Sequence, residues 1–569
     1  MNAASLLMSP VAGHAARRAD GATELVVGVT SHRDLVASDV PALRNQVRDA
    51  LVSLQRSFPD LALTILSPLA EGGDRLVAEA GLALGARLIV PLALPRDWYA
   101  EDFSTPRSRA EFEHLVAQGE IVSLPMPREG HEGLRDPGVA RDRRYLLSGV
   151  YVANHCHLLI ALWDGTADGG LGGTAQIVRY YLGGPLPGAR RARDNLRQML
   201  AGDDDSLALH IPVRRESAPG VMPAPARWLT AGGNVVEGAM PPDFHRIFDR
   251  MQTFEQDRRR YLARHALQHD ASDLVEHRMQ VVDGMAVHFQ HRMNWAMRTI
   301  HLLAVAMGLS FLLYSDSGAA DAMLWVFLLF FLVGLLVASA AHARDWHRKY
   351  VDYRALAEGL RVQSFWRCAG LSMTGDPEFA HDNFMQKQDV ELGWIRNVMR
   401  AAGLAPASAA CDADGAIDDV IEAWVGRPGV SGQLAYYERQ ASLRARHHLR
   451  TRALGQACLW AGVGISLFLA LFHGALLAST RNVLVTTMGA LSLIAAVREA
   501  YAYRKADKEL IKQYRFMRRI YRNARTALDA AGSVREKCEI LRALGEAALA
   551  EHAEWALMHR DRPIEHGRP

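Results

Sequence analysis

Two pairs of strongly apolar segments dominate the hydrophobic pattern of the chain. They cover about residues 297–341 and 453–497, and a short polar turn divides each pair, at residues 315–321 and 479–482. An uncharged stretch of about 20 residues can cross roughly 30 Å of bilayer hydrocarbon as a helix, because its backbone polar groups are then paired internally. A soluble protein would need a large enclosing core to bury four such helices. The pattern therefore predicts a membrane protein with four transmembrane helices in two hairpins.

Basic residues flank both apolar pairs, whereas the two turns carry few charges. Cationic residues are retained on the cytoplasmic side of membrane segments. We therefore expect both hairpins to place their turns outside and to leave both termini and the middle segment in the cytoplasm. The flanking residues are Arg292, Arg298, Arg344, Arg348, Lys349, Arg444, Arg446, Arg450, Arg452, Arg498, Arg504 and Lys505, against Asp316, Asp321 and Arg481 in the turns.

Before the apolar pairs, from Glu24 to about Val213, short apolar runs alternate with amphipathic segments. Near-continuous apolar strands that alternate with helices predict an α/β domain with a parallel sheet covered on both faces. The expected strands are LVVGV, LALTIL, ARLIVPLAL, EIVSL, HLLIALW and LALHIPV, and the expected helices lie near residues 41–58, 74–85, 108–118, 145–155 and 174–182.

Glycine, hydroxyl and charged residues follow three of the expected strands. In parallel sheets, ligands bind outside the carboxyl ends of the strands, where helix N-termini converge. Glycine lets the backbone approach a phosphate, the helix N-terminus attracts its charge, and Arg33 or Arg75 can pair with its oxygens. One such loop is more typical of an ordinary turn, but three at one sheet edge predict a site for a phosphate-bearing or nucleotide ligand. The candidate residues are Gly28, Thr30, His32, Arg33, Glu71, Gly72, Gly73, Asp74, Arg75, Asp164, Gly172, Gly173 and Thr174.

Composition removes several other classes of protein. The 569 residues are enough for three or four units, and the formal net charge of +3 is too small to indicate nucleic acid binding. The five cysteines form no CxxC pair, which argues against a zinc site and against a secreted disulfide framework. The first residues lack the continuous apolar stretch of a signal peptide, so residues 1–23 are expected to be a disordered leader.

The front segment resembles the SLOG superfamily of Rossmann-like domains over about residues 24–215. The likeness rests on GVTSHRDL, LAEGGDRLVAEAGLALGARLIVPLALP, YLLSGVYVANHCHLLIALWDG and GGTAQIVRYY, in this order. It implies a nucleotide-sensing domain. The phosphoribohydrolase members of the group carry a catalytic Glu three residues after the motif Thr, and here that position is Ile177. The absent carboxylate favours a sensor, while Glu71 or Asp74 leaves hydrolysis open.

Charged and aromatic helical segments border both hairpins, and residues 242–292 are expected to link the front domain to the first hairpin. Both halves resemble the SLATT group, two-transmembrane effector modules found beside SLOG sensors in bacterial conflict systems. The likeness implies membrane disruption or pore formation triggered by a nucleotide signal. The expected order is a leader at 1–23, the SLOG-like domain at 24–215, modules at 243–400 and 432–550 separated by a connector at 401–431, and a tail at 551–569.

The patterns predict a cytoplasm-facing ligand-binding domain joined to a duplicated membrane part. The two resemblances imply that the first is a sensor and the second an effector in a bacterial inner membrane, with a role in bacterial conflict or antiphage defence. The spans hold almost no ionisable residues, so a pore would form between protomers of a homo-oligomer, with Gly308, Gly334, Gly462 and Gly464 at close helix contacts. The expected partners are a nucleotide-type messenger and the lipid bilayer, without a metal or nucleic acid. Two alternatives stay open: a membrane-tethered nucleotide hydrolase or phosphoribohydrolase, and a structural membrane protein whose Rossmann-like domain binds nothing.

Overall fold

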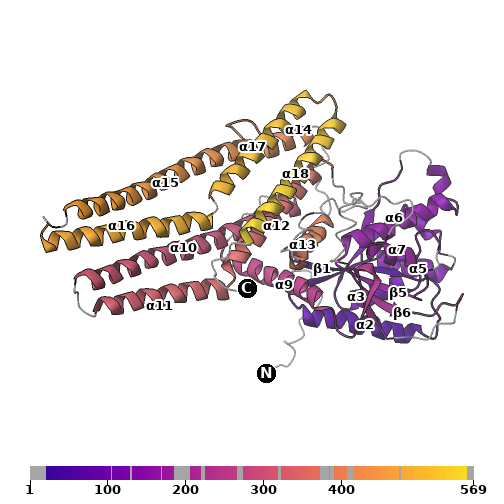
Figure 1. Ribbon diagram of the computed structural model, residues 1–569. Coiled ribbons are helices and arrows are strands. Elements are labelled where there is room, and N and C mark those ends of the chain that lie inside the picture. Colours follow the sequence, from indigo (N-terminus) through magenta and orange to yellow (C-terminus); the bar gives the residue numbers. More distant parts are fainter. Residues whose placement is uncertain are drawn as a thin grey trace, which may run out of the picture. The chain divides into compact units, whose positions relative to one another are not determined.

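The chain divides into two compact units (Figure 1). One comprises Met1–Val281 and Gly359–Asp412, and the other comprises Val282–Glu358 and Ala413–Pro569. The expected leader lies almost wholly outside the residues that the structure describes. This computed structural model describes residues 21–103, 105–127, 131–167, 170–184, 206–218, 225–265, 273–317, 322–371, 384, 390–405, 416–472, 474, 476–505 and 507–560.

The described part of the first unit is built on an eight-stranded sheet in the order β4-β3-β2-β1-β5-β6-β7-β8. The strands from β4 to β6 are parallel, and each of the six corresponds to an expected strand, which confirms the α/β prediction. The antiparallel β7 and β8 were not expected, because neither four-residue strand contains a long apolar run. The strands are β1 (Glu24–Ser31), β2 (Ala62–Leu66), β3 (Arg87–Leu92), β4 (Glu120–Ser123), β5 (Leu158–Trp163), β6 (Leu207–Pro212), β7 (Arg227–Thr230) and β8 (Asn234–Glu237).

Helices cover both faces of this sheet, as right-handed crossovers between parallel strands require. The alternation of side chains along β2 shows this, since Ile65 packs against Gly81 of α3, whereas Leu66 belongs to the cluster formed with α6 and α7. The helices of this unit are α2 (Val40–Ser57), α3 (Gly73–Ala83), α4 (Arg96–Ala100), α5 (Pro106–Val116), α6 (Val139–His155), α7 (Thr174–Tyr181), α9 (Pro242–Leu262) and α13 (Gly393–Gly403). Five of them match the expected helices, with α6 beginning earlier than predicted.

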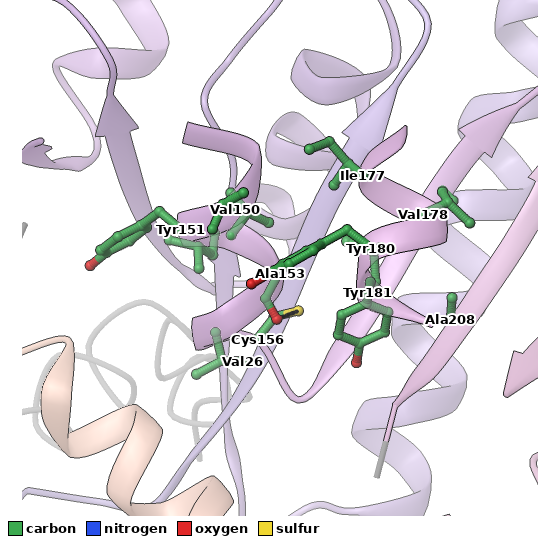
Figure 2. Packing of buried hydrophobic residues seen from close by; sticks show 14 of the residues in the cluster. Val26, Val150, Tyr151, Ala153, Cys156, Ile177, Val178, Tyr180, Tyr181 and Ala208 are labelled. Atoms are coloured by element: carbon green, nitrogen blue, oxygen red, sulfur yellow. Dashed lines mark hydrogen bonds between the residues drawn. The ribbon is translucent and has the colours of Figure 1, made fainter. Parts of the chain in front are cut away.

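The core under α6 and α7 is closely packed against the middle of the sheet (Figure 2). Cys156, at the end of α6, lies against β1 at Gly28, where a β-carbon would be 2.7 Å from Cβ of Cys156 and 2.9 Å from Cγ1 of Val152. Gly28 therefore allows α6 to approach the strand. Burial raises the pKa of the Cys156 thiol to about 12, so this cysteine is an inert core residue.

The second unit is built from long helices that form two hairpins, α10 with α11 and α15 with α16 (Figure 1). The predicted link at residues 242–292 is not one helix, because α9 ends at Leu262 and α10 begins at Leu274. The helices that lie wholly or mostly in this unit are α10 (Leu274–Ser317), α11 (Ala322–Ala343), α12 (Trp346–Cys368), α14 (Ala416–Val420), a π-helical turn at Ile421–Val425, α15 (Gly432–Phe472), α16 (Ala478–Lys505), α17 (Asp507–Ala530) and α18 (Val534–Arg560).

The two hairpin turns differ from the expected positions. The first expected turn, at 315–321, lies largely outside the described part of the chain, although α10 continues to Ser317. The second lies between the end of α15 at Phe472 and the start of α16 at Ala478, so the expected turn at 479–482 is instead the first helical turn of α16. Gly474 explains the earlier break, because glycine is unfavourable in a helix, whereas Ser479 and Asn482 are tolerated in a first turn.

Within the described residues, four helices are long and apolar enough to cross a membrane, namely α10, α11, α15 and α16. At most 17% of the most apolar window of any of them is buried inside the structure. Large apolar side chains are consequently exposed on all four, including Leu302 (70%), Trp325 (72%), Leu471 (69%) and Val483 (65%). An apolar surface of this extent is unfavourable in water, and a lipid environment removes that cost.

Candidate ligand-binding site

The loops after β1, β2 and β5 meet at the carboxyl edge of the sheet, because these three strands are neighbours. The strand order changes direction at β1, since β2, β3 and β4 follow on one side and β5 and β6 on the other. Such switch points create the crevice in which open α/β sheets bind ligands. A cavity of about 370 Å³ lies at this edge. The predicted residues that line it are Thr30, His32, Arg33, Asp74, Gly172, Gly173 and Thr174.

Arg75 and Glu71 are directed away from this cavity. The guanidinium of Arg75 donates hydrogen bonds to the backbone oxygens of Leu69 (3.2 Å) and Ser108 (2.8 Å), and it lies 4.4 Å from the ring centroid of Phe103. Glu71 accepts a hydrogen bond from the Ser108 hydroxyl. These two side chains hold the loop before α3 against α5, so the structure gives them a positioning role.

Gly72 and Gly73 bring the loops after β1 and β2 together. Gly72 has φ +82°, and a β-carbon there would lie 2.6 Å from the backbone oxygens of both His32 and Arg33. A β-carbon at Gly73 would lie 2.6 Å from Cβ of Ser31. Both positions therefore need glycine for contact between loops, and neither lines the cavity.

Asp164, directly after β5, orients His32 beside the cavity. One carboxylate oxygen of Asp164 lies 3.1 Å from Nε2 of His32 and the other lies 3.7 Å from Nη1 of Arg215. Although burial opposes ionisation, hydrogen bonds from Thr166 and His32 lower the pKa of Asp164 below its usual value. Arg215 also donates a hydrogen bond of 2.9 Å to Asp34, so the loops after β1, β5 and β6 form one charged network.

Asp74, in the first turn of α3, is the buried carboxyl of the cavity. It is 2% exposed, and it accepts a 2.6 Å hydrogen bond from the Ser31 hydroxyl. Burial raises its pKa to about 7, even though the Ser31 hydrogen bond and the charges of Arg33 and Arg75 act in the opposite direction. Near neutral pH this group therefore exchanges between the acid and the carboxylate.

Arg33 provides an exposed cation at the cavity, where it forms no ion pair with another described residue. Its guanidinium lies 5.6 Å from the ring centroid of Tyr145 on α6. Tyr145 is held in place by a hydrogen bond to Asp102 and by one of 2.9 Å from Arg141. The Tyr145 ring thus supports Arg33 from a fixed position.

The N-terminus of α7 supplies backbone donors to the same cavity. Gly173 is the N-cap with an extended conformation (φ −69°, ψ 162°), and no side chain caps the helix. The backbone N–H groups of Thr174 and Ala175 donate to no other described residue. Gly172 has φ +79° and packs against the backbone of Leu146, which fixes the loop beside α6. The site therefore combines unpaired backbone donors, a hydroxyl and a guanidinium, a set that suits an anion.

The sequence patterns missed several residues of the cavity wall, including Asp34, Tyr99, Asp142, Tyr145 and Arg215. Arg215 follows the expected strand LALHIPV, so the strand-end rule applied to that strand would have found it. Asp142 and Tyr145 lie on the first turns of α6, which begins at Val139 and not at residue 145. Tyr99 reaches the cavity from α4, a helix too short for periodicity to reveal.

Ile177, the position at which the expected resemblance would place a catalytic Glu, is an apolar residue of the core. It is 2% exposed and packs against α6, where a β-carbon at Gly149 would lie 2.7 Å from its Cγ1. This position is therefore occupied by an apolar contact between α6 and α7. Among the described residues, no group of three or more His, Cys, Asp or Glu side chains is arranged to hold a metal ion.

Comparisons of the chain with models of protein families, with curated proteins and with solved structures found no match.

Proposed function

We propose that the protein is a membrane effector controlled by a nucleotide-type messenger, which binds at the carboxyl edge of the α/β sheet in the first unit. In this proposal, ligand binding favours an arrangement of the membrane helices that permeabilises the bilayer. The observation that carries the proposal is the cavity of about 370 Å³, where the unpaired N-terminus of α7 and the Arg33 guanidinium lie at a topological switch point.

The lining of the cavity supports a nucleotide over a simple anion. The backbone donors of Thr174 and Ala175 and the charge of Arg33 suit phosphate oxygens. The carboxylate of Asp142 suits sugar hydroxyls, and the Tyr145 ring offers a surface on which a base can stack. A site of this size suits one small ligand, because most such sites lie between about 300 and 1,000 Å³.

The exposed apolar helices support the membrane half of the proposal. Basic residues flank both hairpins, so the α/β domain is assigned to the cytoplasmic side of a bacterial inner membrane. Ligand binding at a cytoplasmic domain can act on the membrane helices only through different affinities for two states of the protein. The resemblance to SLOG sensors and SLATT modules supports this assignment and a role in antiphage defence, with a homo-oligomer as the permeabilising form.

Dye release from liposomes tests this function. The full-length protein is reconstituted into vesicles loaded with a quenched dye, with the first unit facing outward, and nucleotides are added one at a time. Release that depends on a nucleotide, and that the Arg33→Ala variant loses, supports the proposal. Nucleotide binding without dye release would contradict the effector half of it.

A second function, nucleotide hydrolysis, is supported by one observation at Asp74. This carboxyl lines the cavity with its pKa raised to about 7, the range suited to a general acid or base, whereas Glu71 is bonded to Ser108 outside the cavity. Turnover of a nucleoside monophosphate or a dinucleotide by the full chain, lost in Asp74→Asn and kept in Glu71→Gln, would favour the hydrolase. Binding without turnover favours the sensor.

A further inference from the structure

A second cavity, of about 400 Å³, lies inside the second unit and has no part in the proposed function. Helices α10, α12, α15, α17 and α18 each contribute residues to its wall. On each helix these residues recur at the spacing of one helical face, as Tyr350, Arg354 and Glu358 do on α12. Four of the five helices lead directly from this wall into or out of an apolar span. The cavity is therefore built at the ends of both transmembrane hairpins.

Aromatic rings form much of the cavity wall. They belong to Tyr350, Tyr436, Tyr437, Tyr514 and Trp555. The ring centroids of Tyr437 and Tyr514 lie 5.8 Å apart, and those of Tyr350 and Trp555 lie 6.0 Å apart. The faces of Tyr and Trp rings attract cations through their quadrupoles.

Two hydrogen-bond acceptors line the wall beside these rings. The Oε1 atom of Gln513 is buried and has no hydrogen-bond partner among the described residues, while Nε2 of the same amide donates to the backbone oxygen of Glu551 at 3.4 Å. The Glu551 carboxylate forms no ion pair within the described chain. Burial and the nearby charge of Glu554 raise the pKa of Glu551, so a bound cation would stabilise its ionised form.

The wall also carries two guanidiniums, which do not cancel the attraction of the cavity for a cation. Arg354 is paired with Asp283, Nη1 to Oδ1, at 2.5 Å. Glu358 also acts on Arg354, and the Arg444 guanidinium lies 5.1 Å from the ring centroid of Tyr514. Together the two guanidiniums carry two positive charges, against the three negative charges of Asp283, Glu358 and Glu551. With the lining histidines neutral, one negative charge is therefore in excess, and the Glu551 carboxylate can provide it. The cavity thus favours a cationic ligand.

We propose that this cavity binds a primary ammonium group, which donates hydrogen bonds to Gln513 and Glu551 and lies against the surrounding aromatic rings. A primary ammonium carries three donors, enough for both acceptors, whereas a quaternary ammonium carries none. The head group of an ethanolamine phospholipid and a soluble primary amine share this chemistry. The lining helices continue into the apolar spans, and this arrangement favours the lipid source.

The test compares ligands and variants with the full-length protein in detergent. Ethanolamine is titrated as the soluble probe, and micelles doped with short-chain phosphatidylethanolamine are compared with micelles doped with phosphatidylcholine, with the unfolding temperature as the readout. Glu551→Gln removes the charge and keeps the shape. Glu546→Gln makes the same change at an exposed position of α18 and is the matched control. Gln513→Met removes the amide acceptor while keeping its length.

A rise in unfolding temperature with an ethanolamine compound, and none with phosphatidylcholine, is the expected result. Glu551→Gln and Gln513→Met should each weaken the apparent affinity about tenfold or more, as loss of a hydrogen bond to a charged group implies, and Glu546→Gln should leave it unchanged. A response to free ethanolamine identifies a soluble amine, and a response to the phospholipid alone identifies a head group. The proposal is overturned if neither compound stabilises the protein, or if Glu551→Gln binds as tightly as the wild type.

Discussion

Ser31 at the end of β1 donates a hydrogen bond of 2.6 Å to Asp74 in the first turn of α3. This contact joins two of the three loops that form the candidate ligand site. It also partly offsets the effect of burial on Asp74, whose pKa remains raised to about 7. The folded state therefore binds a proton at Asp74 more tightly than the unfolded state does.

The stability of the first unit should depend on pH through Asp74. A raised pKa stabilises the fold fully below the unfolded value near 4, and this stabilisation is lost as the pH rises through about 7. Asp74→Asn keeps an uncharged acceptor for Ser31 and removes the titration. Between pH 5 and pH 8, the stability of the variant relative to the wild type should rise by about 1 to 3 kcal/mol, measured from unfolding curves. Parallel pH profiles for the two proteins would show that Asp74 titrates at its ordinary value.

Gly28 should matter for packing and not for contact with a ligand. In Gly28→Ala the new methyl group meets Cys156 and Val152, and overpacking of this kind costs about 1 to 3 kcal/mol. Gly133→Ala is the control, because a β-carbon there meets nothing within 4 Å. Chemical denaturation of both variants measures the difference. Equal stability of the two variants would mean that α6 can move away from β1 without cost.

Gly308 is expected to hold the two hairpins together within one chain. A β-carbon at Gly308 of α10 would lie 2.9 Å from Cδ1 of Leu493 on α16, and one at Gly489 of α16 would lie 3.0 Å from Cδ2 of Leu312 on α10. Gly308→Ala should lower the unfolding temperature in detergent, and Leu493→Ala in the same protein should restore part of the loss. Gly464→Ala is the control, since nothing lies within 4 Å of its β-carbon. If the double variant unfolds at the same temperature as Gly308→Ala, the contact with Leu493 is not the cause of the loss.

The contacts of the membrane glycines show where sequence reasoning stopped. All four candidates were expected at close helix contacts. Gly308 lies at such a contact, with a helix of its own chain, whereas nothing described lies within 4 Å of a β-carbon at Gly464. A small-residue pattern marks a helix that permits close approach, but it does not identify the partner helix. That choice depends on how α10 and α16 pack, which periodicity along one segment does not contain.

In the α/β domain, the sequence predicted the parallel strands but not the direction in which each side chain at a strand end points. Apolar runs predicted all six parallel strands, and the strand-end rule found Thr30, His32, Arg33, Asp74 and Thr174 at the cavity. The same rule also selected Arg75, whose role depends on the long-range contacts with Ser108 and Phe103. A side chain at a strand end can turn either toward the ligand crevice or into a neighbouring helix, and only the packing decides which.

Chemical labelling can test the orientation of the hairpins. A membrane-impermeant maleimide added to intact cells should label Ser479→Cys, because this exposed position in the first turn of α16 is expected outside. The wild-type protein should remain unlabelled until the cells are lysed, since Cys368 and Cys538 are expected in the cytoplasm. Labelling of the wild type in intact cells would indicate that the hairpins have the opposite orientation.

The most direct test of the central claim is nucleotide binding by the purified full-length protein, measured by titration calorimetry. We expect Arg33→Ala to weaken binding about tenfold or more, because a hydrogen bond to a charged group is lost, and the exposed Arg143→Ala on α6 to have no effect. Gly173→Asp should abolish binding through charge repulsion, while Gly173→Ser should retain it. Asp and Ser are both favourable N-cap residues, so α7 is preserved in both variants. The predicted result is that the wild type binds a nucleotide, that Arg33→Ala binds it more weakly, and that Gly173→Asp does not bind it. Unchanged binding by Gly173→Asp, or no nucleotide bound by the wild type, would contradict the claim.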